Sequence, residues 1–200
     1  VGDNNKFPFN INKYLKNLPI VMVNGKDYSV DYSLIRDDYR SSVFNCIENF
    51  KLWCSNLKSL GYNIEEVVGL EIPVTCPYYG GTIDGIVRIN GAYYIIDFKT
   101  SKKISTEYLI QTSAYMWIIN NGYIPELPHI NGIGIIRVDK TKLGSYNDYF
   151  LNEYDPIQYN MIINFQNCFF SYVEAYYRTI NTEYIADNYP YNLENVLKGV

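Results

Sequence analysis

The chain has 200 residues, of which 48% are hydrophobic and 19% charged, with a net charge of −4. This composition predicts one folded domain with a sizeable core and excludes an intrinsically disordered chain. The acidic balance gives no general support to nucleic-acid binding, although a local basic patch remains compatible with it. The sequence contains no secretory signal and no apolar run of about 18 residues, which predicts a soluble intracellular protein with no membrane partner.

The cysteines and the single histidine argue against a structural zinc site. The four cysteines are scattered, without a C-x-x-C pair, and His129 is the one histidine available to help them. This inventory does not fit the usual zinc ligand sets. The cysteines are therefore expected to be reduced and mostly buried thiols: Cys46, Cys54, Cys76 and Cys168.

Residues 1–34 contain proline, glycine and several asparagines and are predicted to be an N-terminal extension, or a linker from a longer protein, since the first residue is Val1. Within them, Asn24-Gly25 predicts a small hairpin over residues 21–30. From about residue 34 to 60, apolar residues recur at steps of three and four, which predicts a helix ended by Gly61. The same spacing places Trp53 in the core.

Three strands are predicted next. Residues 64–74 are rich in β-branched side chains and include Glu71, which is read from the pattern alone as a solvent-facing strand residue. Residues 80–100 form two further strands around Asn90-Gly91, the dipeptide that favours a two-residue type I′ turn. Counting outward from that turn places Ile89 opposite Ala92 and Val87 opposite Tyr94.

The same count places Asp84 directly opposite Asp97, with Lys99 on the same face because side chains alternate along a strand. Opposed carboxylates destabilise a strand pair unless something holds them together. Two hard carboxylate ligands beside an ammonium suit a Mg²⁺ or Mn²⁺ site for phosphodiester chemistry. The alternative is a surface hairpin on which Asp97 and Lys99 form a solvated pair.

The remaining elements follow in chain order. Lys102 and Lys103 lie in a basic loop, after which Ser105 or Thr106 is expected to cap a helix running to about Asn120, with Gly122 beyond its end. A nearly continuous apolar run over residues 130–138 predicts a central strand. Residues 141–154 are expected to be a polar connection, and Asp155-Pro156 begins a helix through about Ile180, followed by a tail over residues 181–200. The fold class is therefore α/β, with a three-stranded meander plus a further strand in a small mixed central sheet flanked by helices.

At this point four motifs match a known family. Glu71, the run Gly81-Thr82-Ile83-Asp84, the run Ile95-Ile96-Asp97-Phe98-Lys99-Thr100, and Gln111-Thr112-Ser113-Ala114-Tyr115 occur in this order. Together they resemble the PD-(D/E)XK nuclease superfamily, and within it the RecB-like branch, which includes the mitochondrial genome maintenance exonuclease and the CRISPR-adaptation nucleases. The resemblance spans roughly residues 64–120 and implies a restriction-endonuclease-like core over residues 35–180.

The resemblance implies a role for each matching residue. Asp84 and Asp97 correspond to metal ligands and Lys99 to the catalytic lysine, while the Phe98 backbone carbonyl completes the metal shell. Glu71 corresponds to an acidic residue that positions the metal or a water. Gln111 and Tyr115 correspond to a Q-x-x-x-Y motif that holds the catalytic groups or the DNA strand.

Two features depart from the family pattern. Many members of this branch carry a metal-binding histidine on the first helix, where this chain has none. His129 is expected to be a loop residue, so the metal shell is expected to use carboxylates alone, or Glu48 or another acid of the first helix. With Cys168 the one cysteine late in the chain, an iron–sulfur cluster is not expected.

These readings predict a Mg²⁺- or Mn²⁺-dependent deoxyribonuclease, with exonuclease action on single strands or DNA ends in replication, recombination or repair. The expected partners are DNA and a fused or associated helicase or replication protein. Candidate phosphate contacts are Lys102, Lys103, Arg137 and Lys140. Two alternatives stay open: a non-catalytic nucleic-acid-binding module of a larger protein, and an RNA endonuclease of the same superfamily.

Overall fold

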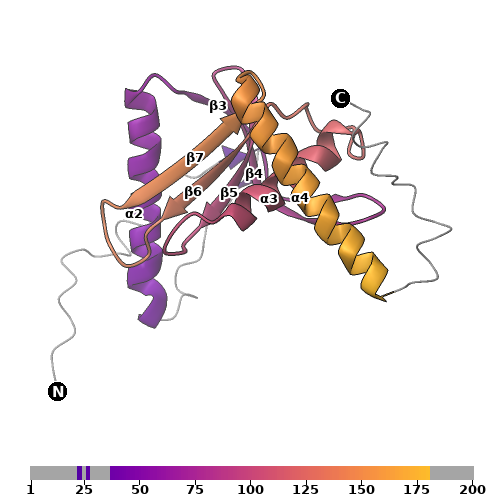
Figure 1. Cartoon of the computed structure of the whole chain (residues 1–200). Helices are drawn as coiled ribbons and strands as arrows, with labels where there is room; N and C mark the ends of the chain where they lie inside the picture. The colour runs from indigo at the N-terminus through magenta and orange to yellow at the C-terminus, as the bar shows by residue number, and fades with distance from the viewer. Residues whose placement is uncertain (1–21, 24–25, 28–36, 181–200) are drawn as a thin grey trace.

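The computed structural model describes residues 22–23, 26–27 and 37–180 (Figure 1). The strands and helices, in chain order, are β1 (Met22–Val23), β2 (Lys26–Asp27), α2 (Asp37–Ser59), β3 (Ile64–Thr75), β4 (Gly80–Ile89), β5 (Ala92–Lys99), α3 (Thr106–Asn120), β6 (Gly132–Val138), β7 (Tyr146–Asn152) and α4 (Pro156–Ile180). The predicted helices and the four predicted strands of the main domain are all present. Most of residues 1–34, and all of the predicted tail over residues 181–200, lie outside the described residues.

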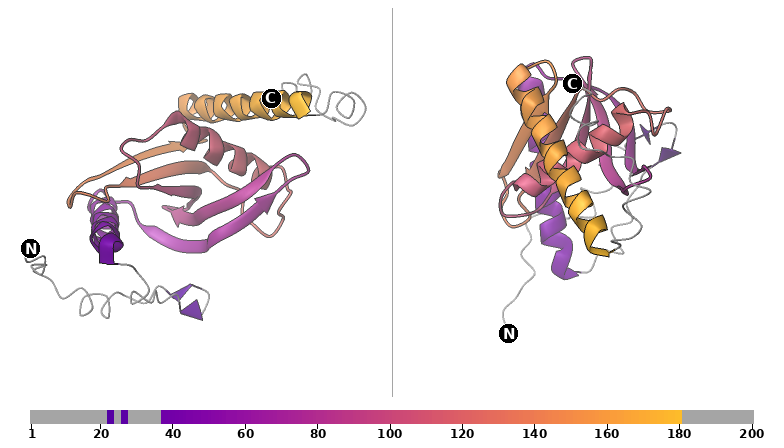
Figure 2. Two further views of the ribbon diagram at one scale, coloured as in Figure 1. Left: turned by 90° about the horizontal axis from the view of Figure 1, so that it is seen from below. Right: turned by 45° about the vertical axis from the view of Figure 1, so that its right-hand side comes forward.

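The fold is α/β, built on a five-stranded mixed sheet with the strand order β3-β4-β5-β6-β7. Neighbouring strands are antiparallel except for the parallel pair β5–β6, which α3 connects. In the left view of Figure 2, α4 lies outermost over α3, which covers one face of the sheet, while α2 lies on the other side. This arrangement leaves β3 and β7 as the two edge strands.

The helices pack through two separate hydrophobic clusters. The larger cluster joins α3 and α4 to one face of the sheet through residues such as Ile95 and Ile133. The smaller one joins α2 to the other face, where Trp53 packs with Ile96 and Ile136. Trp53 is buried, as its helical spacing predicted, and its indole Nε1–H donates to Asp148 Oδ2. Because Asp97 alternates with Ile96, its side chain lies on the face covered by α3.

The turn between β4 and β5 has the geometry that its sequence predicts. Asn90 and Gly91 have φ values of 48° and 83°, so both adopt the left-handed conformation that a type I′ turn requires. The register is also as counted, with Ile89 opposite Ala92 and Val87 opposite Tyr94. A two-residue turn fixes the pairing of every residue that follows it, so the positions of the carboxylates depend on this dipeptide.

One strand was missed. The predicted polar connection over residues 141–154 contains β7, which pairs antiparallel with β6 and places Leu151 opposite Ile133. Asparagine and aspartate are uncommon in strands, and in β7 Asn147 and Asp148 conceal the alternation that ends in buried Leu151. An edge strand tolerates such residues because one side of it faces solvent. β6, between β5 and β7, is buried along its whole length, as predicted.

The remaining sequence predictions have mixed outcomes. β1 and β2 pair as the Asn24-Gly25 hairpin predicted, with Val23 opposite Lys26, although the turn itself lies outside the described residues. All four cysteines are free, as expected, but none is fully buried and Cys168 is exposed. In the part of the chain that the structure describes, no helix is long and apolar enough to cross a bilayer.

A buried asparagine fixes α2 to the turn between β6 and β7. Asn49 is fully buried, and its Nδ2 donates to the carbonyls of Asp139 and Lys142 at 2.7 Å each. Its Oδ1 accepts from the Ser145 backbone N–H at 3.0 Å. The side chain therefore binds three backbone groups of this turn at once.

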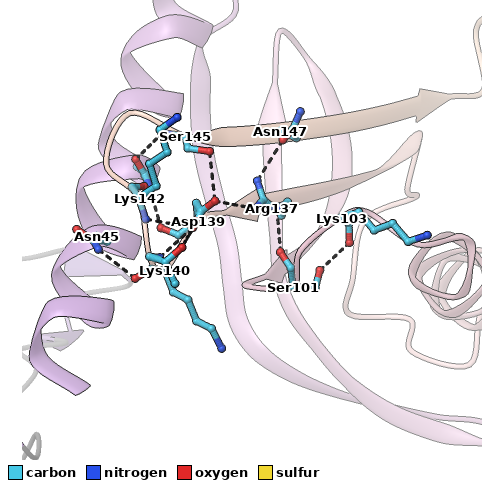
Figure 3. Close-up of polar contacts among 11 residues, drawn as sticks. Asn45, Ser101, Lys103, Arg137, Asp139, Lys140, Lys142, Ser145 and Asn147 are labelled. Atoms are coloured by element: carbon cyan, nitrogen blue, oxygen red, sulfur yellow. Dashed lines mark hydrogen bonds and ion pairs between the residues drawn. The ribbon is translucent and has the colours of Figure 1, made fainter. Parts of the chain in front are cut away.

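We expect Asn49→Ala to lower the free energy of unfolding by about 2–4 kcal/mol, since it removes three hydrogen bonds of a buried side chain at once. Urea denaturation measures the loss, with Asn45→Ala as the control: Asn45 makes one exposed bond, to the Lys140 carbonyl (Figure 3). Equal stabilities of the two variants would contradict the role given to Asn49.

Candidate metal centre on the β4–β5 hairpin

Asp84 and Asp97 lie where β4 and β5 part. The paired residues of the two strands run from Ile89 and Ala92 to Gly85 and Ile96, and the two aspartates occupy the next position. There the Asp84 carboxylate replaces the backbone ladder, because its Oδ2 accepts a hydrogen bond from the Phe98 N–H at 2.7 Å. The β4–β5 ladder therefore ends next to the two aspartates, which are near enough for the charge of Asp84 to act on Asp97.

Asp97 is a buried carboxylate with one oxygen bound and one unbound. The residue is 7% exposed, and Oδ1 accepts from Lys99 Nζ at 2.7 Å. Oδ2 is buried and has no hydrogen-bond partner among the described residues. Burial raises the pKa of Asp97, the hydrogen bond and charge of Lys99 lower it, and the charge of Asp84 raises it further. A cation beside Oδ2 would relieve both effects that oppose ionisation.

Lys99 is held on the same face by α3. Its ammonium lies 4.9 Å from the centre of the Tyr108 ring, within the range of a cation–π interaction. Tyr108 stands near the start of α3, which begins after Ser105, as predicted. Within residues 37–180, however, the Ser105 side chain makes no capping hydrogen bond. The lysine is therefore fixed by a carboxylate on its own strand and by an aromatic ring on the next helix.

The oxygen atoms at this position suit a small divalent cation. Mg²⁺ is usually held in proteins by one or two carboxylates and completes its shell with waters and substrate phosphates. Asp84 and Asp97 supply two carboxylates, and one buried oxygen of Asp97 has no partner within the described part of the chain. The N–H and C=O of a residue in an extended strand point toward the same neighbour, so the Phe98 carbonyl also faces β4. This donor set fits Mg²⁺ or Mn²⁺ better than Zn²⁺, which prefers nitrogen and sulfur.

The third predicted carboxylate does not join this pair. Glu71 falls between the pairs Leu70–Gly85 and Ile72–Ile83, so the register places it beside Asp84. Its φ of 50° is left-handed, however, and its side chain is exposed. Over the described residues, no three histidine, cysteine, aspartate or glutamate side chains form a group able to hold a metal ion. The site therefore contains two acidic residues, with Glu71 at its solvent side.

Gln111 and Tyr115 pack against the strand that carries Asp84. Gln111 Nε2 donates to Tyr115 Oη at 3.0 Å. The Tyr115 hydroxyl lies against Gly81, three residues before Asp84, where a Cβ would come within 2.1 Å of it. The two side chains thus connect α3 to the start of β4. This contact fits the part of their predicted role that concerns holding the catalytic groups.

We expect Gly81→Ala to lower the free energy of unfolding by about 1–3 kcal/mol, because the new methyl group displaces the Tyr115 ring. Adding Tyr115→Phe removes the atom nearest to the methyl group and should restore part of the loss. Urea denaturation of the single and double variants, with Tyr115→Phe alone as the reference, measures both effects. An unchanged Gly81→Ala protein would show that the ring is not packed there.

The predicted phosphate contacts separate into two kinds. Lys102 and Lys103 are exposed in the loop that follows β5, and Lys140 is exposed in the β6–β7 turn. Arg137 differs from this prediction, because the residue is 8% exposed and its guanidinium makes three hydrogen bonds within the protein. Its charge is used inside the fold, so it is not a free phosphate contact.

The substitutes considered for the missing histidine lie elsewhere. Glu48 forms an ion pair with Lys51 at 3.1 Å on α2, which packs on the opposite face of the sheet from Asp97. His129 is an exposed loop residue, as predicted, and contacts the Glu153 carboxylate at 3.1 Å. It precedes β6 at the end of the sheet where Asn131 bonds Tyr93, whereas Asp97 lies toward the other end of β5.

Two residues that help to hold the site and its neighbouring turn, Tyr108 and Asp139, were not assigned a role from the sequence. Tyr108 shares a helix face with Gln111 and Tyr115 at i, i+3 and i+7, and this spacing was the signal for it. Asp139, in the turn after β6, had no such signal, because its hydrogen bonds from Arg137, Thr141 and Lys142 belong to no periodic pattern and form only in the folded turn. Comparison of the chain with models of known protein families and with curated protein sequences gives no match.

Proposed function

We propose that this protein is a Mg²⁺- or Mn²⁺-dependent nuclease that hydrolyses phosphodiester bonds in DNA. The observation that carries the proposal is the pair Asp84 and Asp97 at the end of the β4–β5 ladder. There one buried oxygen of Asp97 lacks a partner among the residues that the structure describes, and the Lys99 ammonium holds the other oxygen at 2.7 Å. A purely structural pair of opposed carboxylates would destabilise the sheet. A bound divalent cation removes that conflict.

Each residue of the site has a distinct part in this proposal. Asp84 and Asp97 hold the ion, with the Phe98 carbonyl beside them. When bound, such an ion supplies positive charge to the phosphate and lowers the pKa of a coordinated water. Lys99 keeps Asp97 oriented through its hydrogen bond, and its ammonium is available to stabilise negative charge that develops on the phosphate.

DNA is the preferred substrate, with single strands or ends favoured, because the motif set resembles the RecB-like nucleases. A helicase or replication protein, fused or associated, is the proposed partner by the same resemblance. The exposed Lys102 and Lys103, directly after the strand that carries Asp97 and Lys99, are suited to contact phosphates flanking the cleaved bond.

The test is a cleavage assay with end-labelled single-stranded DNA, duplex DNA and RNA, each with Mg²⁺, Mn²⁺ or EDTA. We expect cleavage of DNA that requires the ion, with 5′-phosphate on the products. Cleavage of RNA alone would favour the endonuclease alternative. Binding without cleavage under every ion would favour the non-catalytic module. If the protein neither bound nor cleaved any of the three substrates, nucleic acid would be rejected as the ligand.

A further inference from the structure

We propose that Arg137 is a positioning residue that fixes the loop after β5, so that Lys102 and Lys103 are presented to the nucleic-acid strand. The inference rests on the proposed nuclease function and extends it to the way the substrate is held. It replaces the prediction that Arg137 contacts phosphate itself. Figure 3 shows Arg137 between the loop of Ser101 and Lys103 on one side and Asn147 and Asp139 on the other.

The guanidinium of Arg137 joins three separate segments. Its Nε donates to the Ser101 carbonyl at 2.7 Å, in the loop that follows β5. One terminal nitrogen donates to Asn147 Oδ1 on β7 at 3.2 Å, and the other to Asp139 Oδ2 at 2.9 Å. The register places Arg137 beside Lys99 in the parallel pair β5–β6. The link therefore begins two residues after the proposed catalytic lysine.

The β6–β7 turn, to which Arg137 is bound through Asp139, is itself held by several hydrogen bonds. Asp139 Oδ1 accepts from the backbone N–H groups of Thr141 and Lys142 and from the Thr141 hydroxyl. The bonds from Thr141, followed by that from Arg137, hold the pKa of Asp139 far below its usual range. Asn49 in turn ties the same turn to α2. Arg137 thus connects the loop to a turn that the rest of the fold holds in place.

At the other end, Arg137 and Ser101 hold the loop that carries the two lysines. Ser101 gives Arg137 its carbonyl, and its hydroxyl donates to the Lys103 carbonyl at 2.7 Å. The loop is therefore fixed at Ser101 and closed by the bond from Ser101 to Lys103. Lys102 and Lys103 are both exposed on this loop. A pinned loop loses less conformational entropy when its side chains bind a ligand than a mobile one does.

Arg137→Lys tests the inference while keeping a positive charge next to Asp139. An ammonium is a compact point charge that lacks the planar fork reaching three acceptors at once. The first readout is amide hydrogen exchange, which we expect to become faster in residues 100–104 while the β4–β5 hairpin keeps its protection. Arg88→Lys is the matched control, since Arg88 pairs with Glu65 at the hairpin end of β4.

The second readout is the affinity for a fluorescent single-stranded oligonucleotide with Ca²⁺ in place of Mn²⁺. We expect Arg137→Lys to weaken binding by about three- to tenfold. The slope of log K against log salt concentration should become shallower by about 0.7 for each lysine that no longer contacts a phosphate. In a Lys102→Ala/Lys103→Ala background the same change should alter affinity by less than about twofold, because the groups through which it acts are gone.

Three results would overturn the whole proposal, and a fourth would overturn the part that concerns the lysines. Unchanged exchange in residues 100–104 would show that Arg137 does not fix the loop. An equal loss of affinity in both backgrounds would show that Arg137 acts on DNA without the two lysines. A uniform rise in exchange across the domain would show a general loss of stability instead. If the loop changes but the wild-type protein binds no nucleic acid, lysine presentation fails together with the nuclease function, while the structural link stands.

Discussion

Asp97→Asn is expected to abolish divalent-dependent cleavage, with a fall in kcat of about 10³-fold or more, because several kcal/mol of charge stabilisation depend on the ion. The amide keeps the size of the side chain but weakens the hold on the cation. We also expect Mn²⁺ to raise the melting temperature of the wild-type protein by about 5–10 °C at a hundred times its dissociation constant. Asp97→Asn should lose that rise.

The melting experiment separates loss of metal binding from loss of folding, since it is read without any substrate. Glu66→Gln is the control, because it makes the same carboxylate-to-amide change at an exposed residue of β3 near the hairpin turn. Glu66→Gln should retain both cleavage and the response to Mn²⁺. An Asp97→Asn protein that still responds to Mn²⁺ would remove Asp97 from the metal centre.

Lys99→Met is expected to lower kcat by about 10²–10³-fold, the effect of removing one charge-stabilising donor from an active site. The methionine side chain approximates the length of the lysine stem and can remain against Tyr108. Because Asp84 and Asp97 are untouched, the rise in melting temperature with Mn²⁺ should persist. Single-turnover cleavage together with thermal denaturation measures the two effects.

The control for this variant is Lys58→Met, at an exposed position in the last turn of α2. It makes the same chemical change far along the helix that covers the opposite face of the sheet, and should leave cleavage unchanged. If Lys99→Met cleaved at the wild-type rate, the lysine would serve only to balance the charge of Asp97.

The two variants together divide the site into an ion-holding part and a charge-stabilising part. Asp97→Asn should lose both the metal response and cleavage, whereas Lys99→Met should lose cleavage alone. This division depends on the hydrogen bond between Lys99 and Oδ1, which leaves Oδ2 of Asp97 for the ion.

Much of this geometry could be predicted because it is local. The turn at Asn90-Gly91 restricts two φ angles, and the period of a strand then sets every pair that follows as far as Gly85 and Ile96, one position before Asp84 and Asp97. The helices were equally readable: α2 and α4 each present a repeating apolar face, and α3, which is apolar on most sides, lies between Ser105 and Gly122. Asp155 caps α4 as predicted, with Oδ1 accepting from the Ile157 N–H at 2.8 Å.

The rest could not be predicted because it depends on contacts between distant residues. β7 is concealed by polar residues that only an edge position tolerates. Arg137 looks in the sequence like any cation at a strand end, and only packing shows that Ser101, Asp139 and Asn147 consume its donors. Likewise, the left-handed backbone at Glu71 is a local distortion of β3 that alternation does not reveal.

The most direct test of the metal centre is anomalous diffraction from crystals grown with Mn²⁺ and a short, uncleavable oligonucleotide. We expect an ion between Asp84 and Asp97, with carboxylate oxygens from both residues and the Phe98 carbonyl at about 2.0–2.2 Å. A phosphate should approach the ion from the side of Lys99. An ion bound elsewhere, or no anomalous peak between the two carboxylates at saturating Mn²⁺, would contradict the proposed function.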